Sequence, residues 1–172
     1  MTNELLINAN IELLESAREV IEHLDAATYA ESSRKSGQRF GAQLRHVLEF
    51  YESFLNGLPT SHIDYDARVR DKSVEQDREA GLARIDEVIQ GLRCEPLLST
   101  EFIIWVRMED APEEAGDAYM TSSITRELQV LRSHTTHHFA LMAMLLIDWG
   151  ITVNCNFGVA PSTLRYRQSI AA

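Results

Sequence analysis

Apolar residues recur with a period close to 3.6 residues in four segments of the chain, at about residues 3–24, 41–55, 73–92 and 123–149. This period places the apolar side chains of each segment on one face of an α-helix. In the first segment the face is formed by Leu6, Ile7, Leu13, Leu14, Val20, Ile21 and Leu24. We therefore predict four amphipathic helices that bury these faces against one another.

Residues that end or begin helices separate the four segments. The sequence NGLP at residues 56–59 is expected to end the second helix, with Gly57 in a left-handed C-cap and the proline blocking continuation. Ser73 and Gln76 have capping-box spacing, which predicts that the third helix begins at Ser73. The tail, residues 151–172, has no clear period and is expected to lie across the helices.

The segment at residues 97–106 differs from the helical ones. Its run of apolar residues at 102–106 favours β-structure and is too short for a long helix. A turn is predicted at residues 111–116, and a partner strand at 118–121. The prediction is thus an all-α fold, a four-helix bundle with a short β-hairpin between the third and fourth helices. Residues 1–172 are expected to form a single domain.

Charge and composition argue against nucleic-acid and membrane partners. The formal net charge is −10, and the basic residues are scattered instead of forming the concentrated patch that a phosphate backbone requires. The longest nearly apolar run, residues 139–149, is shorter than the roughly 20 residues that cross a bilayer. The chain begins without a cationic leader pattern, and Cys94 and Cys155 have no metal-type or redox-type spacing. We expect a cytoplasmic protein without disulfides.

Two of the six histidines form an HxxxH pair in the fourth predicted helix. His134 and His138 are four residues apart, so they differ by about 40° around the helix axis and lie one turn apart. Their rings therefore project from one face, which also carries Glu127 and several leucine and methionine residues. Buried imidazoles cost free energy unless they are hydrogen-bonded or bound, and a metal would hold them in the neutral form. The spacing predicts that this pair shares a divalent metal.

A third ligand must come from another helix, and His46 is the best candidate. It lies on the apolar side of the second helix, away from Arg45 and Glu49. The alternative is a core histidine that only packs. Three histidines with an open fourth position are typical of catalytic metal sites, and imidazole ligands suit zinc, nickel and iron.

The other histidines are expected to lie outside this site. His137 lies roughly 100° around the helix axis from His138, which favours a supporting or surface position. His23 lies near the end of the first helix, where a capping or surface role is favoured. His62 follows the proline of residues 56–59 and is predicted to be exposed.

Two helix sequences carry a family resemblance: GAQLRHVLEFYESFLNGL at residues 41–58 and LRSHTTHHFALMAMLL at residues 131–146. They resemble those of the DinB/YfiT-like superfamily of metal-dependent proteins. The stretches IDYDARVRDKSVEQD (63–77) and FGVAPSTLRYR (157–167) resemble one branch of that superfamily. The resemblance extends over essentially the whole chain. The chain departs from the superfamily pattern after HxxxH, where many relatives carry His-Arg-Gly-Gln and this chain has Phe139-Ala140-Leu141.

The resemblance implies an up-down-down-up four-helix bundle, often dimeric, whose metal triad falls on His46, His134 and His138. It also implies a chemistry, because some members transfer low-molecular-weight thiols such as bacillithiol or mycothiol. We therefore expect a homodimer that acts on a small-molecule substrate, as a thiol-dependent transferase or a hydrolase. The alternatives are a non-catalytic metal-binding or dimerising bundle, and a bundle whose histidines merely pack.

Several further residues are candidates for supporting roles. Arg68 and Arg70 lie in a charged segment that either forms a rim near the metal or is fixed by intramolecular ion pairs, and the second role is the commoner one. Glu127 is expected to act as an orienting group or general base, or to be a solvated first-turn residue. Tyr51 and Tyr166 have packing as their default role.

Overall fold

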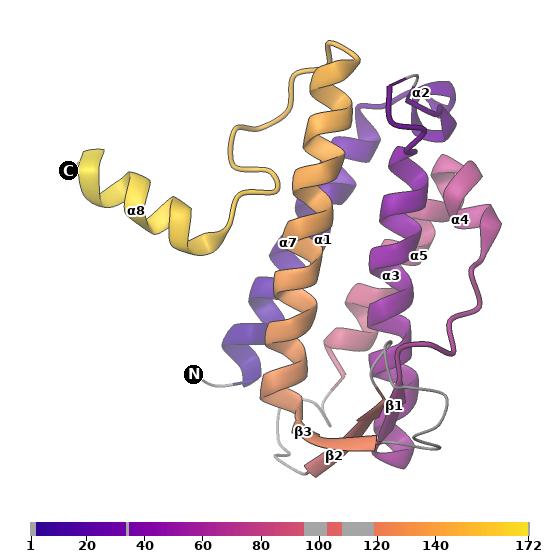
Figure 1. The fold of residues 1–172 in the computed structure, drawn as a ribbon, viewed down its shortest axis with the longest axis vertical. Coiled ribbons are helices and arrows are strands. Elements are labelled where there is room, and N and C mark those ends of the chain that lie inside the picture. The colour runs from indigo at the N-terminus through magenta and orange to yellow at the C-terminus, as the bar shows by residue number, and fades with distance from the viewer. Residues whose placement is uncertain (1–2, 34, 95–102, 108–118, 172) are drawn as a thin grey trace.

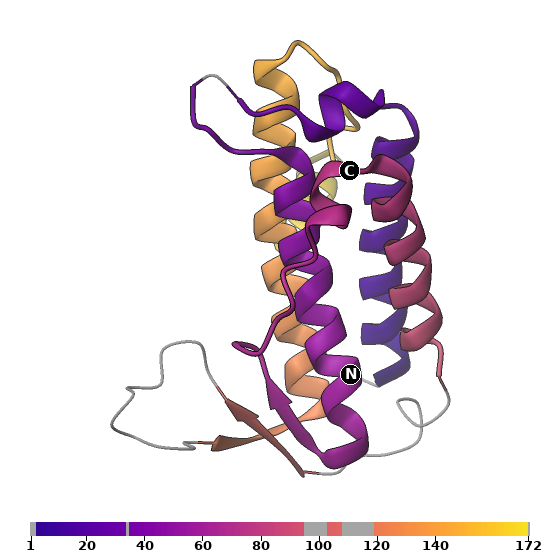
Figure 2. The same ribbon diagram turned by 90° about the vertical axis from the view of Figure 1, so that its right-hand side faces the viewer.

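The computed structural model describes residues 3–33, 35–94, 103–107 and 119–171, and four long helices form most of it. These are α1 (Asn3–Glu22), α3 (Phe40–Gly57), α5 (Arg78–Leu92) and α7 (Ile124–Asp148). Helix α1 packs against α5 and α7, and α3 packs against the same two helices (Figure 1). The view in Figure 2 shows α5 running beside α1. The protein is thus mainly helical, as predicted.

The predicted apolar faces form the core between these helices. Side chains that are almost fully buried come from all four long helices: Leu6, Leu14 and Ile21 of α1, Leu44, Val47 and Phe54 of α3, Ile85 and Leu92 of α5, and Leu128, Leu131, Phe139 and Met142 of α7. Burying each large apolar side chain contributes roughly 1.5–3 kcal/mol relative to leaving it exposed. The period-3.6 pattern therefore identified the surfaces that hold the helices together.

The third predicted helix is in fact two helices, α4 (Lys72–Gln76) and α5. Asp77 has an extended backbone and its carboxylate accepts a hydrogen bond from the Glu79 amide at 2.9 Å, so it caps a new helix. The expected capping box at Ser73 is also wrong, because Asp71 caps α4 by accepting from the Ser73 amide. Helix α4 packs closely on α3, where a Cβ on Gly41 would collide with the Glu75 carbonyl oxygen.

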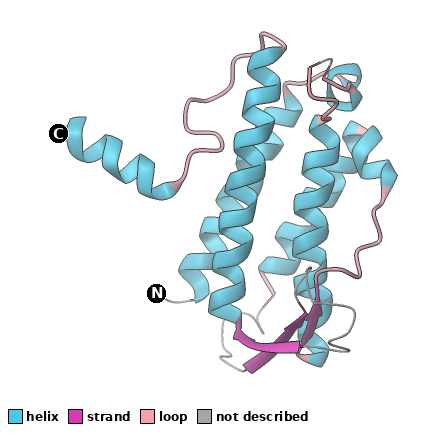
Figure 3. Cartoon of the chain, in the orientation of Figure 1, coloured by secondary structure: helices cyan, strands magenta, loops and turns pink. Residues whose placement is uncertain are grey.

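A small sheet covers one end of the long helices (Figure 3). Strands β2 (Ile103–Arg107) and β3 (Tyr119–Ser123) pair antiparallel, which confirms the predicted partner strand. The sequence did not predict β1 (His62–Asp64), which pairs parallel with β2. The predicted turn at residues 111–116 and residues 97–102 of the predicted strand lie outside the described residues. Strand β3 leads directly into α7, whose N-cap is Ser123.

Two connections differ from their predictions. Gly57 ends α3 with φ −79°, not in the left-handed region, because the chain continues into a 3₁₀ turn, η1 (Leu58–Thr60). Glycine is needed there because a Cβ would meet the backbone of β1 at His62 and Ile63. The short helix α2 (Ala26–Ala30), capped by Asp25, was also not predicted.

The tail was expected to lie across the helices, and this expectation is wrong for residues 161–171. They form helix α8 (Pro161–Ala171), which projects away from the other helices (Figure 1). The tail is anchored before α8 begins, where Phe157 stacks on Phe139 with ring centroids 5.0 Å apart. None of the helices in the described part of the chain is long and apolar enough to cross a membrane.

Candidate metal centre

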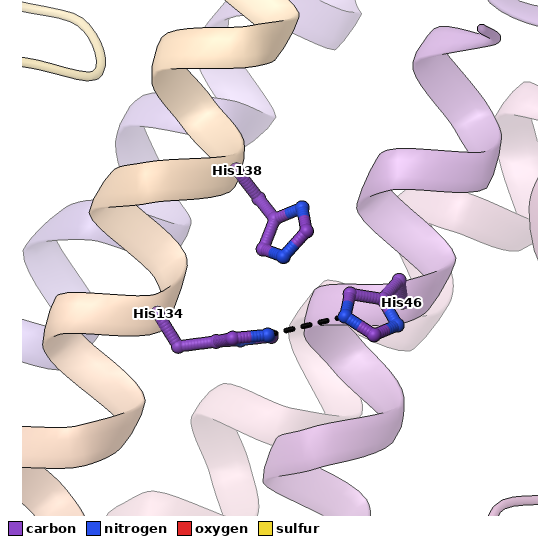
Figure 4. Close-up of side chains that lie close together, drawn as sticks. All are labelled: His46, His134 and His138. Carbon is purple, nitrogen blue, oxygen red and sulfur yellow. Dashed lines mark hydrogen bonds between the residues drawn. The ribbon is translucent and has the colours of Figure 1, made fainter.

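Three histidines from two neighbouring helices converge on one point. His46 comes from α3, and His134 and His138 come from successive turns of α7 (Figure 4). One ring nitrogen from each lies within 4.8 Å of the other two. All three side chains are half-buried at the edge of the core. The structure therefore brings together the three residues that the sequence selected as metal ligands.

The spacing of the ring nitrogens suits a metal ion. The Nε2 atoms of His46 and His134 are 3.1 Å apart. In a tetrahedral site with metal–nitrogen bonds of about 2.05 Å, two ligand nitrogens lie about 3.3 Å apart. Only a small adjustment would separate His46 Nε2 from His134 Nε2 by this distance. The donor set and its spacing fit a divalent transition metal.

Gln43 fixes the ring of His138. His138 Nδ1 lies 2.6 Å from Gln43 Oε1, an atom that only accepts, so Nδ1 carries the proton and donates. The Gln43 side-chain amide in turn donates to Gln38 Oε1 at 2.6 Å, which sets its orientation. The Nε2 lone pair of His138 is therefore free for a metal. A hydrogen-bonded partner of this kind is typical of ligating histidines.

Arg68 sets the opposite arrangement on His46. Its Nη1 lies 3.2 Å from His46 Nδ1, and because a guanidinium has only donors, Nδ1 must accept. The proton of neutral His46 is then on Nε2 and is donated to His134 Nε2. His134 consequently carries its own proton on Nδ1, a buried atom without a hydrogen-bond partner among the described residues. In this arrangement a proton occupies the point where the three rings meet.

Burial keeps the three rings neutral. It is the largest cause that lowers the pKa of His46 and His138 to about 4 and that of His134 to about 3. Neighbouring histidines add to the effect, and the positive charge of Arg68 lowers the pKa of His46 and His134 further. At neutral pH all three rings are in the form that binds metals.

Aromatic rings and Arg68 enclose one side of the cluster. Phe50 stacks on His134 with ring centroids 4.0 Å apart, and Arg68 lies over the same phenyl ring at 4.6 Å. Tyr65 stacks on Phe50 at 5.1 Å. These contacts tie the segment after β1 to the histidine cluster. They place Arg68 beside the cluster, which agrees with the predicted alternative that its segment forms a rim near the histidines.

Glu127 has a different role from those predicted. It is buried, not solvated, and its two carboxylate oxygens accept hydrogen bonds from Tyr65 at 2.9 Å and Ser122 at 2.5 Å. Among the described residues, no histidine forms a hydrogen bond with the Glu127 carboxylate. Burial and the Glu127 carboxylate raise the pKa of the Tyr65 hydroxyl, so this hydroxyl stays protonated and donates. Glu127 orients Tyr65, and through it the ring of Phe50.

In the described part of the chain, none of the remaining candidates forms a hydrogen bond with the three histidines. Tyr51 is fully buried, donating to Asn10 at 2.7 Å and sharing a hydrogen bond with Thr135. Tyr166 is 64% exposed on α8. Arg70 is exposed in the segment before α4. Ion pairs also fix this segment, as the alternative interpretation expected: Asp64 pairs with Arg107 at 3.5 Å and Asp71 with Arg84 at 3.2 Å.

The positions of the other histidines agree with their predictions. His137 is exposed and is not part of the cluster. His23 is exposed and its Nδ1 contacts the Glu19 carbonyl oxygen at 2.7 Å, a helix-end position. His62 is exposed. Cys94 and Cys155 are both exposed free thiols.

The residues that support the triad were not predicted from the sequence. Gln43 and Phe50 lie three residues before and four residues after His46, so they share its face of α3. That spacing was a usable signal, since a polar and an aromatic residue flank a candidate ligand on one helix face. The contact between Arg68 and His46 Nδ1 had no such local signal.

Comparisons with known proteins give a partial similarity. No family model matches the chain, and no solved structure matches it. The chain is similar to FK506-binding protein 5 of Rhizopus delemar, with 29% identity over 104 residues, or 60% of this chain. The match spans about a quarter (27%) of the fungal protein's length.

Proposed function

We propose that this chain is a divalent-metal-dependent enzyme of the DinB/YfiT-like type, with His46, His134 and His138 as its metal ligands. The convergence of the three ring nitrogens, all within 4.8 Å of one another, carries the proposal. The side-by-side packing of α1, α3, α5 and α7 supports the four-helix bundle that the sequence resemblance implies. Zinc or nickel is the preferred metal, and iron suits the same ligands.

The site favours catalysis over a purely structural role because three protein ligands leave a coordination position open. A divalent metal in such a site supplies Lewis acidity and lowers the pKa of a thiol or water in the open position. The chain's own residues would then act on the substrate. Gln43 holds His138 in the ligating tautomer, and Phe50 shields His134 from solvent on one side. Arg68 adds positive charge beside His46, which favours an anionic group such as a thiolate.

The reaction class we propose is therefore transfer of a low-molecular-weight thiol to an electrophile, or hydrolysis of a small substrate. The test is a turnover screen of zinc-loaded and nickel-loaded protein with several cellular thiols and electrophiles, and with simple esters and amides. The double variant His134→Ala/His138→Ala is the negative control, and Arg167→Gln on α8 is the matched surface control. Turnover that the double variant loses and Arg167→Gln keeps is expected. Metal binding without any turnover above the double variant would instead favour the non-catalytic alternative.

A further inference from the structure

A groove runs along the side of α7 and ends where α8 begins. Its inner part has a volume of about 570 Å³. Its outer part continues along α7 with about 690 Å³, and the two share Gln129, Ser133 and His137. We call this continuous surface the α7 groove. Its size is in the range of pockets that hold small ligands.

The α7 groove is positive although the protein is acidic. Arg132 lines the inner part and Arg126 the outer part, and none of the described residues that line either part is acidic. The chain as a whole has a formal net charge of −10. Two arginines gathered along one cavity lining concentrate anions there against the average field of the molecule.

Arg132 has no compensating partner in the described part of the chain. Its Nε is buried without a hydrogen bond, and its guanidinium forms no ion pair there. Glu12 and Glu19 line a neighbouring cavity that Arg132 also reaches, but neither pairs with it. A partly buried guanidinium without an acceptor costs free energy, and an anionic ligand with oxygen acceptors would recover it.

The far wall of the groove is fixed, and it supplies further hydrogen-bond donors. Gly158 has φ +72°, and a Cβ there would collide with the backbone of α7 at Phe139 and Ala140. The glycine therefore allows the chain before α8 to lie directly on α7. Ser162, at the start of α8, then faces the groove together with Ser133 and Gln129 of α7. The hydroxyl and amide groups of these side chains can donate to ligand oxygens.

We propose that the α7 groove binds a small ligand through a phosphate or carboxylate group held by Arg132. His134 lines the outer part of the groove, so a ligand held in this way extends toward the histidine cluster. The idea that this ligand is a substrate of the metal centre rests on the proposed function. Anion binding by the groove does not require the metal.

The test uses the full chain without metal, so its outcome is independent of the metal site. Backbone ¹H–¹⁵N spectra are recorded during titration with inorganic phosphate, and in a second arm with succinate, at ionic strength held constant with sodium chloride. Saturable shifts at Gln129, Ser133 and Ser162 in either arm support the proposal, and the two arms distinguish phosphate from carboxylate.

Variants identify the role of Arg132. Since a charge-assisted hydrogen bond contributes about 1.5 kcal/mol or more, Arg132→Gln should weaken binding at least about tenfold. Arg132→Lys, which keeps the charge, should bind more tightly than Arg132→Gln, and Arg167→Gln on α8 should bind as the unaltered chain does. The spectra themselves report whether each variant is folded. Absence of saturable shifts in both arms, shifts confined to other surfaces, or equal affinity in folded Arg132→Gln would overturn the proposal.

Discussion

Replacing Arg68 by glutamine is expected to strengthen metal binding. Arg68 donates to His46 Nδ1, which leaves the proton of this ring on Nε2, the atom that faces His134. Ligation through Nε2 of a neutral ring requires the proton to move to Nδ1, where it would face a guanidinium that cannot accept it. Metal binding therefore has to break the contact between Arg68 and His46.

The magnitude follows from that contact. A hydrogen bond to a charged group contributes about 1.5–3 kcal/mol, and about 1.4 kcal/mol corresponds to tenfold in a dissociation constant. Removing the guanidinium should therefore raise zinc affinity about 10- to 100-fold. Glutamine adds an oxygen that can accept from His46 Nδ1, as partners of ligating histidines usually do. Arg68→Met removes the guanidinium without adding an acceptor. The difference in zinc affinity between Arg68→Met and Arg68→Gln therefore measures what the new acceptor contributes.

The assay is competition for zinc against a chromophoric chelator at neutral pH. Arg68→Lys, which keeps a charged donor, should remain closer to the original affinity than Arg68→Gln. Arg70→Gln is the matched control, because Arg70 is exposed in the same segment. Unchanged or weaker zinc binding by both Arg68→Gln and Arg68→Met would refute the tautomer argument.

Three further predictions concern the groups around the cluster. Gln43→Ala should weaken zinc binding about 10- to 100-fold in the same assay, because His138 loses the acceptor that fixes its tautomer. Zinc affinity equal to that of the control Arg70→Gln would contradict this. In metal-free protein, the three histidines take up protons near pH 6.5 in the unfolded chain but only near pH 3–4 in the folded chain. The free energy of unfolding should therefore fall as pH decreases from 6.5 toward 3. Urea unfolding at several pH values checks this, and His134→Ala/His138→Ala should flatten the dependence. Tyr65→Phe should lower the free energy of unfolding in urea by about 1–3 kcal/mol, because buried Glu127 loses a hydrogen-bond donor. A loss of stability confined to metal-loaded protein would instead place Glu127 in the metal site.

Helices in which apolar residues recur every 3.6 residues over several turns could be predicted from the sequence. Elements that depend on contacts with distant parts of the chain could not. The faces of α1, α3 and α7 rest on residues such as Leu14, Val47 and Leu131, whose burial follows from local spacing. The break at Asp77 was hidden because an aspartate serves equally well in a first turn or as a cap. The three residues of β1 form a strand only because β2 lies beside them.

The candidate site shows the same division. HxxxH spacing and the apolar side of α3 were enough to select His134, His138 and His46. Glu127 was misinterpreted because its position in the first turn suggested solvent, whereas β3 and Tyr65 cover it. Arg68 could be placed only on a rim, since its contact with His46 Nδ1 depends on how the segment after β1 returns to α3.

The central claim is that His46, His134 and His138 bind one divalent transition metal. Elemental analysis of protein purified without a histidine tag, before and after incubation with zinc or nickel and removal of excess ion, tests it most directly. We predict about one equivalent of metal in the unaltered chain and a loss of metal in His134→Ala/His138→Ala. Less than about a tenth of an equivalent, with no uptake of added zinc or nickel, would contradict the claim.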